Sequence, residues 1–338
     1  QPVENDWNTI SKADTMDDLD FADVRGQNHV KRALEVAAAG GHNCLMIGSP
    51  GSGKTMLARR MPSILPDMTF EEALEVSKIH SVAGLLPADS SLSTRRPFRA
   101  PHHSISSVSL IGGGKIPKPG EVSLAHLGVL FLDELPEFNK NALEVLRQPL
   151  EDGFALISRI NASITYPCRT TLIAAANPCK CGFYLDDTRE CTCSPQEIKN
   201  YLGKLSGPLL DRLDIQVEVP TLKYHELSEE QEKAESSREI RSRVNRARAL
   251  QQKRFSGKGI YCNAQMSHTM INQYCRMGKE ESSLMWEAYM KLNLTARAHN
   301  RILKVARTIA DLDEAENINC VHIAEAIQYR ALDRNLFR

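Results

Sequence analysis

Short apolar runs, each bounded by glycine or polar residues, recur through the first two thirds of the chain. Three of them are continuous, at residues 43–47 (N-C-L-M-I), 129–133 (V-L-F-L-D) and 171–176 (T-L-I-A-A-A), and a fourth strand-like run follows at 215–219. Continuous apolar runs are typical of parallel strands that are buried on both faces. We therefore predict a parallel sheet at the centre of the protein.

Between and after these runs, apolar residues recur three or four positions apart, which is the spacing of one helix face. Residues 27–39 follow this spacing, and Gly40-Gly41 then ends the helix. Further helices are predicted at 54–64, 70–77, 142–151, 240–250, 283–292, 296–312 and 321–332. Two β-rich runs, at 155–160 and 162–166, predict a hairpin around Asn161.

This pattern divides the chain into three parts. Residues 1–20 are polar and acidic and predict a segment with few core contacts, residues 21–222 predict an α/β core, and residues 223–338 predict a helical linker and a small all-α domain. A chain of 338 residues is long enough to bury a large core in more than one domain. We expect an α/β fold followed by a separate helical domain.

A glycine-rich loop joins the first strand to the helix at 54–64. Its sequence, G-S-P-G-S-G-K-T, fits the P-loop pattern, and the strand and helix around it supply the context that the motif requires. The backbone N–H groups of such a loop surround a phosphate, Lys54 reaches the β- and γ-phosphates, and Thr55 places its hydroxyl on Mg²⁺. The expected nucleotide-binding residues are Gly48, Ser49, Pro50, Gly51, Ser52, Gly53, Lys54, Thr55 and Met56.

Two carboxylates, Asp133 and Glu134, follow the apolar run at 129–133. The carboxyl ends of strands in an open α/β sheet are where ligands bind. After a P-loop, this pair is typical of a Walker B motif, in which Asp133 holds Mg²⁺ and Glu134 orients and polarises the attacking water. The alternative is a pair of strand-end carboxylates at an ordinary turn.

Four cysteines form two close pairs, Cys179-x-Cys181 and Cys191-x-Cys193. Four thiols on two short segments suit a tetrahedral Cys₄ zinc site, although C-x-C is tighter than the usual spacing. Free reduced thiols and a redox disulfide are the alternatives. Nine cysteines without a secretory signal indicate a reducing compartment, and we expect the cytoplasm.

Composition excludes some classes of function. The formal net charge is zero, so nucleic-acid binding would depend on local basic patches. No run of 18 apolar residues occurs, so we expect no membrane partner. The arginine-rich stretch at 238–248 favours a solvated helix face over a nucleic-acid patch. For His102 and His103, a structural or loop role is favoured over metal binding.

Several features in order resemble an AAA+ ATPase: the P-loop, the Walker B pair, Asn177, the D-R-L-D stretch and Arg297. The segments F-R-A-P-H-H-S-I-S, N-P-C-K-C-G, C-T-C and T-A-R-A-H-N-R-I-L-K-V-A-R narrow this to the magnesium-chelatase-like ATPases called YifB or ComM. The resemblance covers about residues 20–335. It implies an AAA+ P-loop core with a parallel sheet, followed by a small all-α lid similar to the C-terminal domain of magnesium chelatase.

The resemblance also assigns roles to three residues outside the two motifs. Asn177 fits sensor 1, which contacts the γ-phosphate or the lytic water; a strand-terminating Asn before Pro178 is the alternative. Arg212 fits an arginine finger that reaches the neighbouring subunit's γ-phosphate, and an intrachain salt bridge with Asp211 or Asp214 is the alternative. Arg297 fits sensor 2 and would swing over the nucleotide.

The family implies a homo-oligomeric ring, expected to be a hexamer, that hydrolyses ATP with Mg²⁺ between subunits. ComM-type members are associated with DNA branch migration and recombination in natural transformation. Two inserts, at about 106–120 and 156–167, would point into the pore and contact single-stranded or branched DNA through Lys115, Lys118, Arg159 and Asn161. The leading hypothesis is therefore an ATP-driven DNA translocase or helicase.

Other interpretations remain open. The runner-up is a protein-remodelling or metal-insertion motor, which the chelatase resemblance suggests, and a non-catalytic ATP-binding scaffold is a third. Family members usually carry an N-terminal Lon-protease-like domain. A chain that begins at Gln1 without that domain is expected to be a fragment or a processed form.

Overall fold

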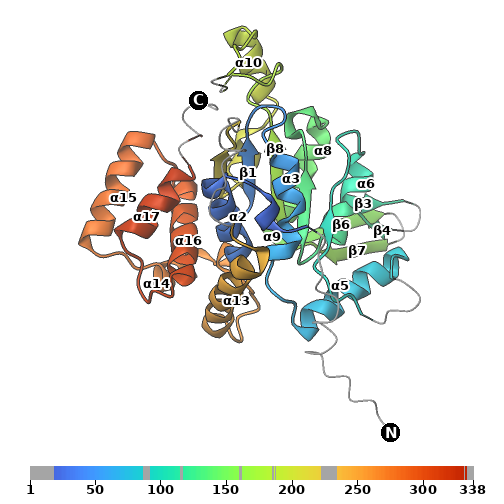
Figure 1. The fold of residues 1–338 in the computed structure, drawn as a ribbon. Coiled ribbons are helices and arrows are strands. Elements are labelled where there is room, and N and C mark those ends of the chain that lie inside the picture. Colours follow the sequence, from blue (N-terminus) through green and yellow to red (C-terminus); the bar gives the residue numbers. More distant parts are fainter. Residues whose placement is uncertain are drawn as a thin grey trace.

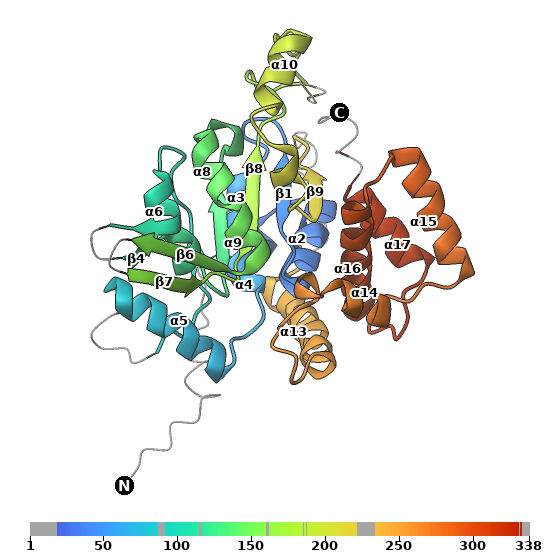
Figure 2. The same ribbon diagram turned by 180° about the vertical axis from the view of Figure 1, so that it is seen from behind.

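A five-stranded parallel sheet lies at the centre of the protein, with helices on both of its faces (Figures 1 and 2). The computed structural model describes residues 19–86, 92–114, 117–159, 162–184, 186, 188–221, 234–330 and 332. The strand order is β2-β5-β8-β1-β9. Their bounds are β1 Cys44–Ile47, β2 Phe98–Arg99, β5 Val129–Leu132, β8 Thr171–Ala176 and β9 Ile215–Glu218. The predicted parallel sheet is confirmed, with β2 as an additional edge strand.

The continuous apolar runs are explained by two hydrophobic clusters, one on each face of the sheet. In β1, Cys44 and Met46 belong to one cluster, whereas Leu45 and Ile47 belong to the other. Successive side chains of a strand point to opposite faces, so both sets must be apolar when both faces are covered. This burial holds the carboxyl ends of β1, β5 and β8 side by side.

The core helices begin and end where local chemistry requires it. α2 (Asn28–Gly40) ends before Gly41, whose φ of 69° is left-handed and suits glycine. α5 (Phe70–Ala83) begins at Phe70 as predicted, where Thr69 and Glu72 form a capping box, but it continues beyond Ser77 until Gly84 ends it. The remaining core helices are α6 (Ser107–Ile111), α7 (Glu121–Leu124), α10 (Pro195–Leu202) and α11 (Gly207–Leu210), with 3₁₀ turns at η1 (Phe21–Asp23) and η2 (Leu135–Glu137).

Two predicted helices are each divided into two. The helix expected at 54–64 is α3 (Lys54–Arg59) and α4 (Met61–Ile64), and that expected at 142–151 is α8 (Lys140–Val145) and α9 (Arg147–Asp152). Pro62 and Pro149 lie in the second member of each pair. Because proline has no N–H, it removes the hydrogen bond to the residue four positions earlier, and the first helix stops there.

The two inserts predicted at 106–120 and 156–167 lie together on the side of the sheet opposite the C-terminal helices (Figures 1 and 2). The first contains the short antiparallel pair β3 (Gly112–Gly113) and β4 (Lys118–Pro119), and the second is the hairpin β6 (Phe154–Arg159) and β7 (Ala162–Pro167). Tyr166 Oη donates to the Pro117 carbonyl over 3.0 Å. Lys118 is exposed on β4, whereas Lys115, Asn161 and the side chain of Arg159 lie outside the described residues.

The C-terminal helices pack against the core rather than standing apart from it. They are α13 (Ser237–Arg254), α14 (His268–Tyr274), α15 (Lys279–Leu292), α16 (Ala296–Leu312) and α17 (Cys320–Gln328), with the turn η3 (Asn263–Gln265). α13 and α16 both contact α2, and one apolar cluster continues from β1 and α2 into these helices. Among the described helices, none combines the length and apolar character that a membrane crossing requires.

The arginine-rich helix α13 is only in part the predicted solvated helix face, because Arg238 and Arg246 are exposed whereas Arg248 is buried. Arg243 pairs with Glu35 and Glu235, Arg246 pairs with Glu314, and the buried Arg248 donates to the Ala38 carbonyl over 3.0 Å. The spacing of α13 predicted a helix correctly, but it could not show that α2 and α16 cover two of its sides. The arginines join elements of the same chain.

Candidate nucleotide-binding site

The P-loop lies at the carboxyl edge of the sheet, between β1 and α3. The Gly48 N–H donates to the Ala176 carbonyl of β8 over 3.2 Å, which ties the loop to the neighbouring strand. A Cβ at Gly48 would lie 2.2 Å from the Val219 carbonyl oxygen, so no side chain fits there. Gly51 and Gly53 have φ values of 80° and 95°, in the left-handed region that favours glycine. The glycine spacing of the motif therefore follows from the loop's backbone geometry.

Lys54 is buried inside this loop. Its ammonium donates to the carbonyls of Gly48 (2.8 Å) and Ser49 (2.9 Å). Burial lowers the pKa of Lys54 to about 8, although Asp133 and Glu134 act to raise it. A phosphate would offer this ammonium charged acceptors in place of neutral carbonyls, and charge-assisted hydrogen bonds are the stronger kind. The site is suited to a polyanion.

Thr55 and Asp133 meet across the end of the sheet. The Thr55 hydroxyl donates to the Asp133 carboxylate over 2.7 Å, which joins α3 to the end of β5. A hydroxyl and a carboxylate oxygen held together are hard ligands of the kind that Mg²⁺ prefers, and Mg²⁺ sites commonly use one or two protein ligands plus phosphate oxygens. The donor set therefore fits a magnesium–nucleotide complex.

Glu134 is held in a left-handed conformation, with φ 53°. Such values are uncommon for a residue with a side chain and are frequent at functional sites. The Glu134 N–H donates to the Asp133 carboxylate over 2.9 Å. The turn exposes the Glu134 side chain, which is 55% accessible, at the rim of the site. A carboxylate in this place can accept a hydrogen bond from water.

Sequence reasoning missed the residue beside Glu134. His103 Nδ1 lies 3.5 Å from Glu134 Oε2, and the His103 ring packs edge-on against Phe138. Sequence analysis favoured a structural or loop role for this histidine. The two residues are 31 positions apart, and no spacing rule connects them. The structure thus adds His103 to the rim of the candidate site.

Asn177 lies between the P-loop and the Walker B pair. β8 is hydrogen-bonded to both β1 and β5, and its last residue, Ala176, is level with Ile47. Asn177 is therefore level with Gly48, at the same edge of the sheet as Asp133. Asn177 therefore lies at the edge of the sheet that carries the P-loop, where the sequence predicted it.

Arg212 lies at the opposite, amino edge of the sheet, just ahead of β9. Its guanidinium donates to the carbonyls of Arg147 (2.9 Å) and Pro208 (2.6 Å) and forms a salt bridge with Glu151. The intrachain partner is thus Glu151 and not Asp211 or Asp214, the alternatives expected from the sequence. Asp214 pairs instead with Arg301.

Arg297 is exposed at the start of α16. One helical turn later, Arg301 pairs with Asp214 at the amino edge of the sheet. One turn is about 5.4 Å long, so Arg297 also belongs to that edge. The expectation that Arg297 swings over the nucleotide of its own chain therefore does not fit the structure, because the P-loop is at the other end of the strands.

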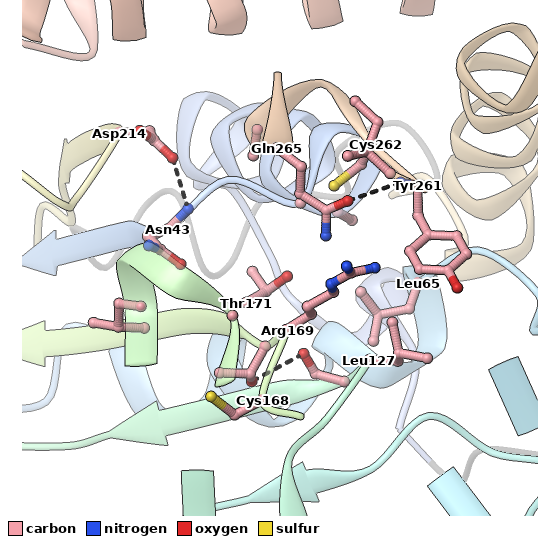
Figure 3. Close-up of a pocket in the computed structure, with 18 of the residues that line it drawn as sticks. Asn43, Leu65, Leu127, Cys168, Arg169, Thr171, Asp214, Tyr261, Cys262 and Gln265 are labelled. Carbon is pink, nitrogen blue, oxygen red and sulfur yellow. Dashed lines mark hydrogen bonds between the residues drawn. The ribbon is translucent and has the colours of Figure 1, made fainter. Parts of the chain in front are cut away.

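A cavity of about 440 Å³ lies at this amino edge, between the sheet and the C-terminal helices (Figure 3). Asn43 and Thr171 line it from the strand side, and Tyr261 and Gln265 line it from the helical side. Arg212, Arg301 and Lys304 also belong to its lining. The cavity brings together basic residues from segments that are far apart in the chain.

The four clustered cysteines converge on one point. Cys179 Sγ is 3.3 Å from Cys181 Sγ and 3.6 Å from Cys191 Sγ, and all four sulfurs, including that of Cys193, lie within 4.8 Å of one another. The sulfurs of a tetrahedral site with Zn–S bonds of ~2.3 Å are about 3.8 Å apart. The thiols are free, and their arrangement fits one tetrahedral metal ion.

Comparisons with known proteins agree with this geometry. The family model described as "Magnesium chelatase, subunit ChlI" matches residues 20–227, and the model of its C-terminal part matches residues 234–330. Competence protein ComM of Haemophilus influenzae is 48% identical over 94% of this chain and 61% of its own length. Protein YifB of Escherichia coli K12 is 47% identical with the same coverage.

The magnesium-chelatase 38 kDa subunit of Rhodobacter capsulatus is more distant. It is 24% identical over 62% of this chain and 59% of that subunit. The chain spans about three fifths of the length of each of these relatives. With both family models matched in order and the sheet, P-loop and helical part in place, the chain belongs to the magnesium chelatase subunit ChlI family of AAA+ proteins, in which it resembles ComM and YifB.

Proposed function

We propose that this chain is the ATPase part of a ring-forming motor that hydrolyses ATP and translocates on DNA. The observation that carries the proposal is the buried ammonium of Lys54 inside the P-loop, beside the hydrogen-bonded pair Thr55 and Asp133. Membership of an AAA+ family suggests ATPase activity in addition. Measuring ATP turnover by the purified chain, with and without branched DNA, tests both parts of the proposal.

The chemistry proposed for each residue follows from its place. Lys54 and the loop N–H groups bind the phosphates, and Thr55 and Asp133 hold Mg²⁺, which would neutralise charge on the β- and γ-phosphates. Glu134 orients the attacking water by accepting its hydrogen bond and takes up its proton. Asn177 contacts the terminal phosphate or this water. His103, as a neighbour of Glu134, positions that carboxylate.

A ring is part of the proposal because the P-loop and the Walker B pair lie at one edge of the sheet, whereas Arg212 lies at the opposite edge. In the proposed ring, Arg212 acts on the γ-phosphate of the ATP bound by the neighbouring subunit. The oxygens of that phosphate would then replace the Glu151 carboxylate as the acceptor of its hydrogen bonds. Arg297 lies at the same edge, so any contact it makes with nucleotide would be with the neighbour's. Hexameric assembly is the form we propose, by resemblance to ring-forming AAA+ proteins.

DNA is the polymer along which we propose that the motor translocates. The name of the relative ComM is that of a competence protein, and this supports a role in branch migration during natural transformation and recombination. The two inserts pack against each other, so Lys118 and Arg159, with Lys115 and Asn161, would form one contact surface in the pore. Backbone phosphates bind such residues without regard to base sequence.

A metal-insertion motor is the second candidate. The family description and the distant match to the magnesium-chelatase 38 kDa subunit favour it. Stimulation of ATP hydrolysis by DNA, and not by a metal–porphyrin system, would separate the two. A reducing, cytoplasmic location is also proposed, since all nine cysteines are free thiols.

Zinc is the further cofactor that we propose, beside ATP and Mg²⁺. The distances between the sulfurs of Cys179, Cys181, Cys191 and Cys193 support it. Elemental analysis of protein purified in reducing buffer without chelator should find about one zinc per chain.

A further inference from the structure

The thiol cluster lies directly against the P-loop. Gly182, which follows Cys181, is buried and has φ +90°. A Cβ at Gly182 would lie 2.5 Å from Pro50 Cδ, so the backbone at Gly182 is in close contact with the proline ring. Pro50 is in the middle of the phosphate-binding loop. The cysteine loop can approach the P-loop this closely because a glycine stands at position 182.

A second contact joins the same two loops through Asp186. Its carboxylate accepts a hydrogen bond from the Thr221 hydroxyl over 2.8 Å, and the nearby Ser49 hydroxyl helps to hold the pKa of Asp186 well below its usual range. Ser49 belongs to the P-loop, and Thr221 follows β9. Asp186 and Gly182 both lie between the two cysteine pairs. The segment that the four thiols close is thus the segment that touches the P-loop.

The described residues of this segment bury little apolar surface. Gly182 is buried, and Phe183 is half-buried and stacks with Arg189, whereas the side chains of Tyr184, Thr188 and Glu190 are exposed. Ordering a segment that buries so little apolar surface is opposed by its conformational entropy. A cross-link at the two ends of a loop reduces that entropy before folding and so favours the ordered form.

We propose that one zinc ion, bound by Cys179, Cys181, Cys191 and Cys193, holds this segment against the P-loop, and that zinc occupancy thereby sets the affinity of the nucleotide site. The thiols release their protons when they bind the ion, and no electron transfer is involved. The second half of this proposal rests on the proposed function, because it takes ATP as the ligand of the P-loop.

The sequence position of the cluster supports a link to the ATP site. Cys179 comes two residues after Asn177, at the end of the strand that lies between β1 and β5. An ion at Cys179 therefore anchors the chain immediately after the candidate sensor residue. Loss of the ion would release the chain after Asn177 on one side of the site and the contact of Gly182 with Pro50 on the other.

The first experiment compares zinc-loaded chain with chain stripped by a chelator under reducing conditions and then exchanged into chelator-free buffer. Binding of a fluorescent ATP analogue in the presence of Mg²⁺ should weaken at least ~10-fold on stripping, about the loss of one or two hydrogen bonds. Adding back zinc should restore it. Equal affinity in the two forms, or iron in place of zinc by elemental analysis, would overturn the proposal.

A readout that does not involve nucleotide keeps the test independent of the proposed function. Arg189 is exposed in the segment, so trypsin cleavage after it should be faster in the stripped chain than in the zinc-loaded chain. If the loaded chain fails to bind ATP, the proposed function fails, whereas the cleavage rates still decide whether zinc holds the segment. Unchanged cleavage would contradict that part.

Variants can distinguish the effect of losing the zinc ion from the effect of losing the contact between the cysteine loop and the P-loop. Cys191→Ser with Cys193→Ser should lose zinc and nucleotide affinity together. Asp186→Ala should keep zinc and lose affinity, because it removes the carboxylate that lies beside Ser49 and accepts from Thr221, and leaves all four thiols. Cys320→Ser, at a half-buried thiol on α17, is the matched control and should change neither. An Asp186→Ala chain with parental affinity would show that the contact does not matter.

Discussion

The two edges of the central sheet handle charge in opposite ways. At the carboxyl edge, the ammonium of Lys54 is bonded to neutral carbonyls, and the Glu134 side chain is exposed at the rim. At the amino edge, Arg212 is paired with Glu151 and Arg301 with Asp214. A buried charge that has no full counter-charge close by is poised for a charged ligand, whereas a paired one stabilises the fold until something replaces its partner.

This difference bears on how a ring would work. In the proposed ring, the groups at one edge would bind a nucleotide, and the neighbour's nucleotide would draw the basic groups at the other edge away from their own carboxylates. The pKa of Asp214 shows that the charged groups at the amino edge are paired within the chain. Although burial would raise the pKa of Asp214, Arg301 and His42 hold it well below its usual range.

The largest expected effect is at Arg212. In the proposed ring, Arg212→Ala should bind ATP but lower its hydrolysis by about 10³-fold or more, the usual contribution of an arginine finger. Mixing these subunits with Lys54→Ala subunits should restore part of the activity, because each supplies what the other lacks. Turnover by the mixed rings is the measurement, once assembly has been verified by light scattering.

Glu151→Gln is the matched variant for Arg212, because it removes the intrachain partner and leaves the arginine. If Arg212 acts on the neighbour, Glu151→Gln should retain hydrolysis while lowering the unfolding temperature slightly. If the salt bridge is the whole role of Arg212, the two variants should lose similar stability and no rescue should occur. That result would contradict the proposal that Arg212, at the amino edge, acts on the nucleotide of a neighbouring subunit.

Glu134→Gln should bind ATP and hydrolyse it at least ~100-fold more slowly, the usual worth of a positioned general base. Lys54→Ala should instead lose binding, which a fluorescent ATP analogue would report. Glu137→Gln is the control, since Glu137 is exposed nearby and pairs with Lys204 at 3.5 Å. Near-parental turnover by the Glu134 variant would exclude this carboxylate from the mechanism.

The pKa of Lys54 predicts a pH dependence of nucleotide affinity. In the free chain burial lowers this pKa to about 8, and bound phosphate favours the charged ammonium, which raises it. Affinity should therefore be constant below pH 8 and fall by up to ~10-fold per pH unit above it, as binding must take up a proton. Lys54→Arg should bind without this decline, because guanidinium stays charged.

The smallest effect is expected at the inserts. Changing Lys115, Lys118 and Arg159 together to alanine should lower DNA affinity and DNA-stimulated turnover and leave basal hydrolysis intact. The slope of log affinity against log salt should become less negative by about 0.9 for each DNA phosphate that the variant no longer neutralises. The same charge change at the exposed residues Lys253, Lys279 and Lys291 is the control. Parental DNA binding by the insert variant would contradict the pore assignment.

The sequence alone determined what is local. The eight residues of the P-loop are contiguous, and two of its glycines, Gly51 and Gly53, are required by φ values that a single loop imposes. The strands β1 and β5 were readable because both of their faces are buried, which requires apolar side chains at successive positions. The thiols at 179, 181, 191 and 193 were readable as one group, because one residue separates the members of each pair and nine residues separate the two pairs.

Only the tertiary structure decided which distant groups meet. It placed His103 beside Glu134, chose Glu151 over Asp211 and Asp214 as the partner of Arg212, and set Gly182 against Pro50. Helical spacing in α13 likewise predicted an apolar face without showing what covers it. Periodicity reports whether a side chain is buried, but the identity of its neighbour depends on how the whole chain is packed, and residues tens of positions apart carry no local signal of that.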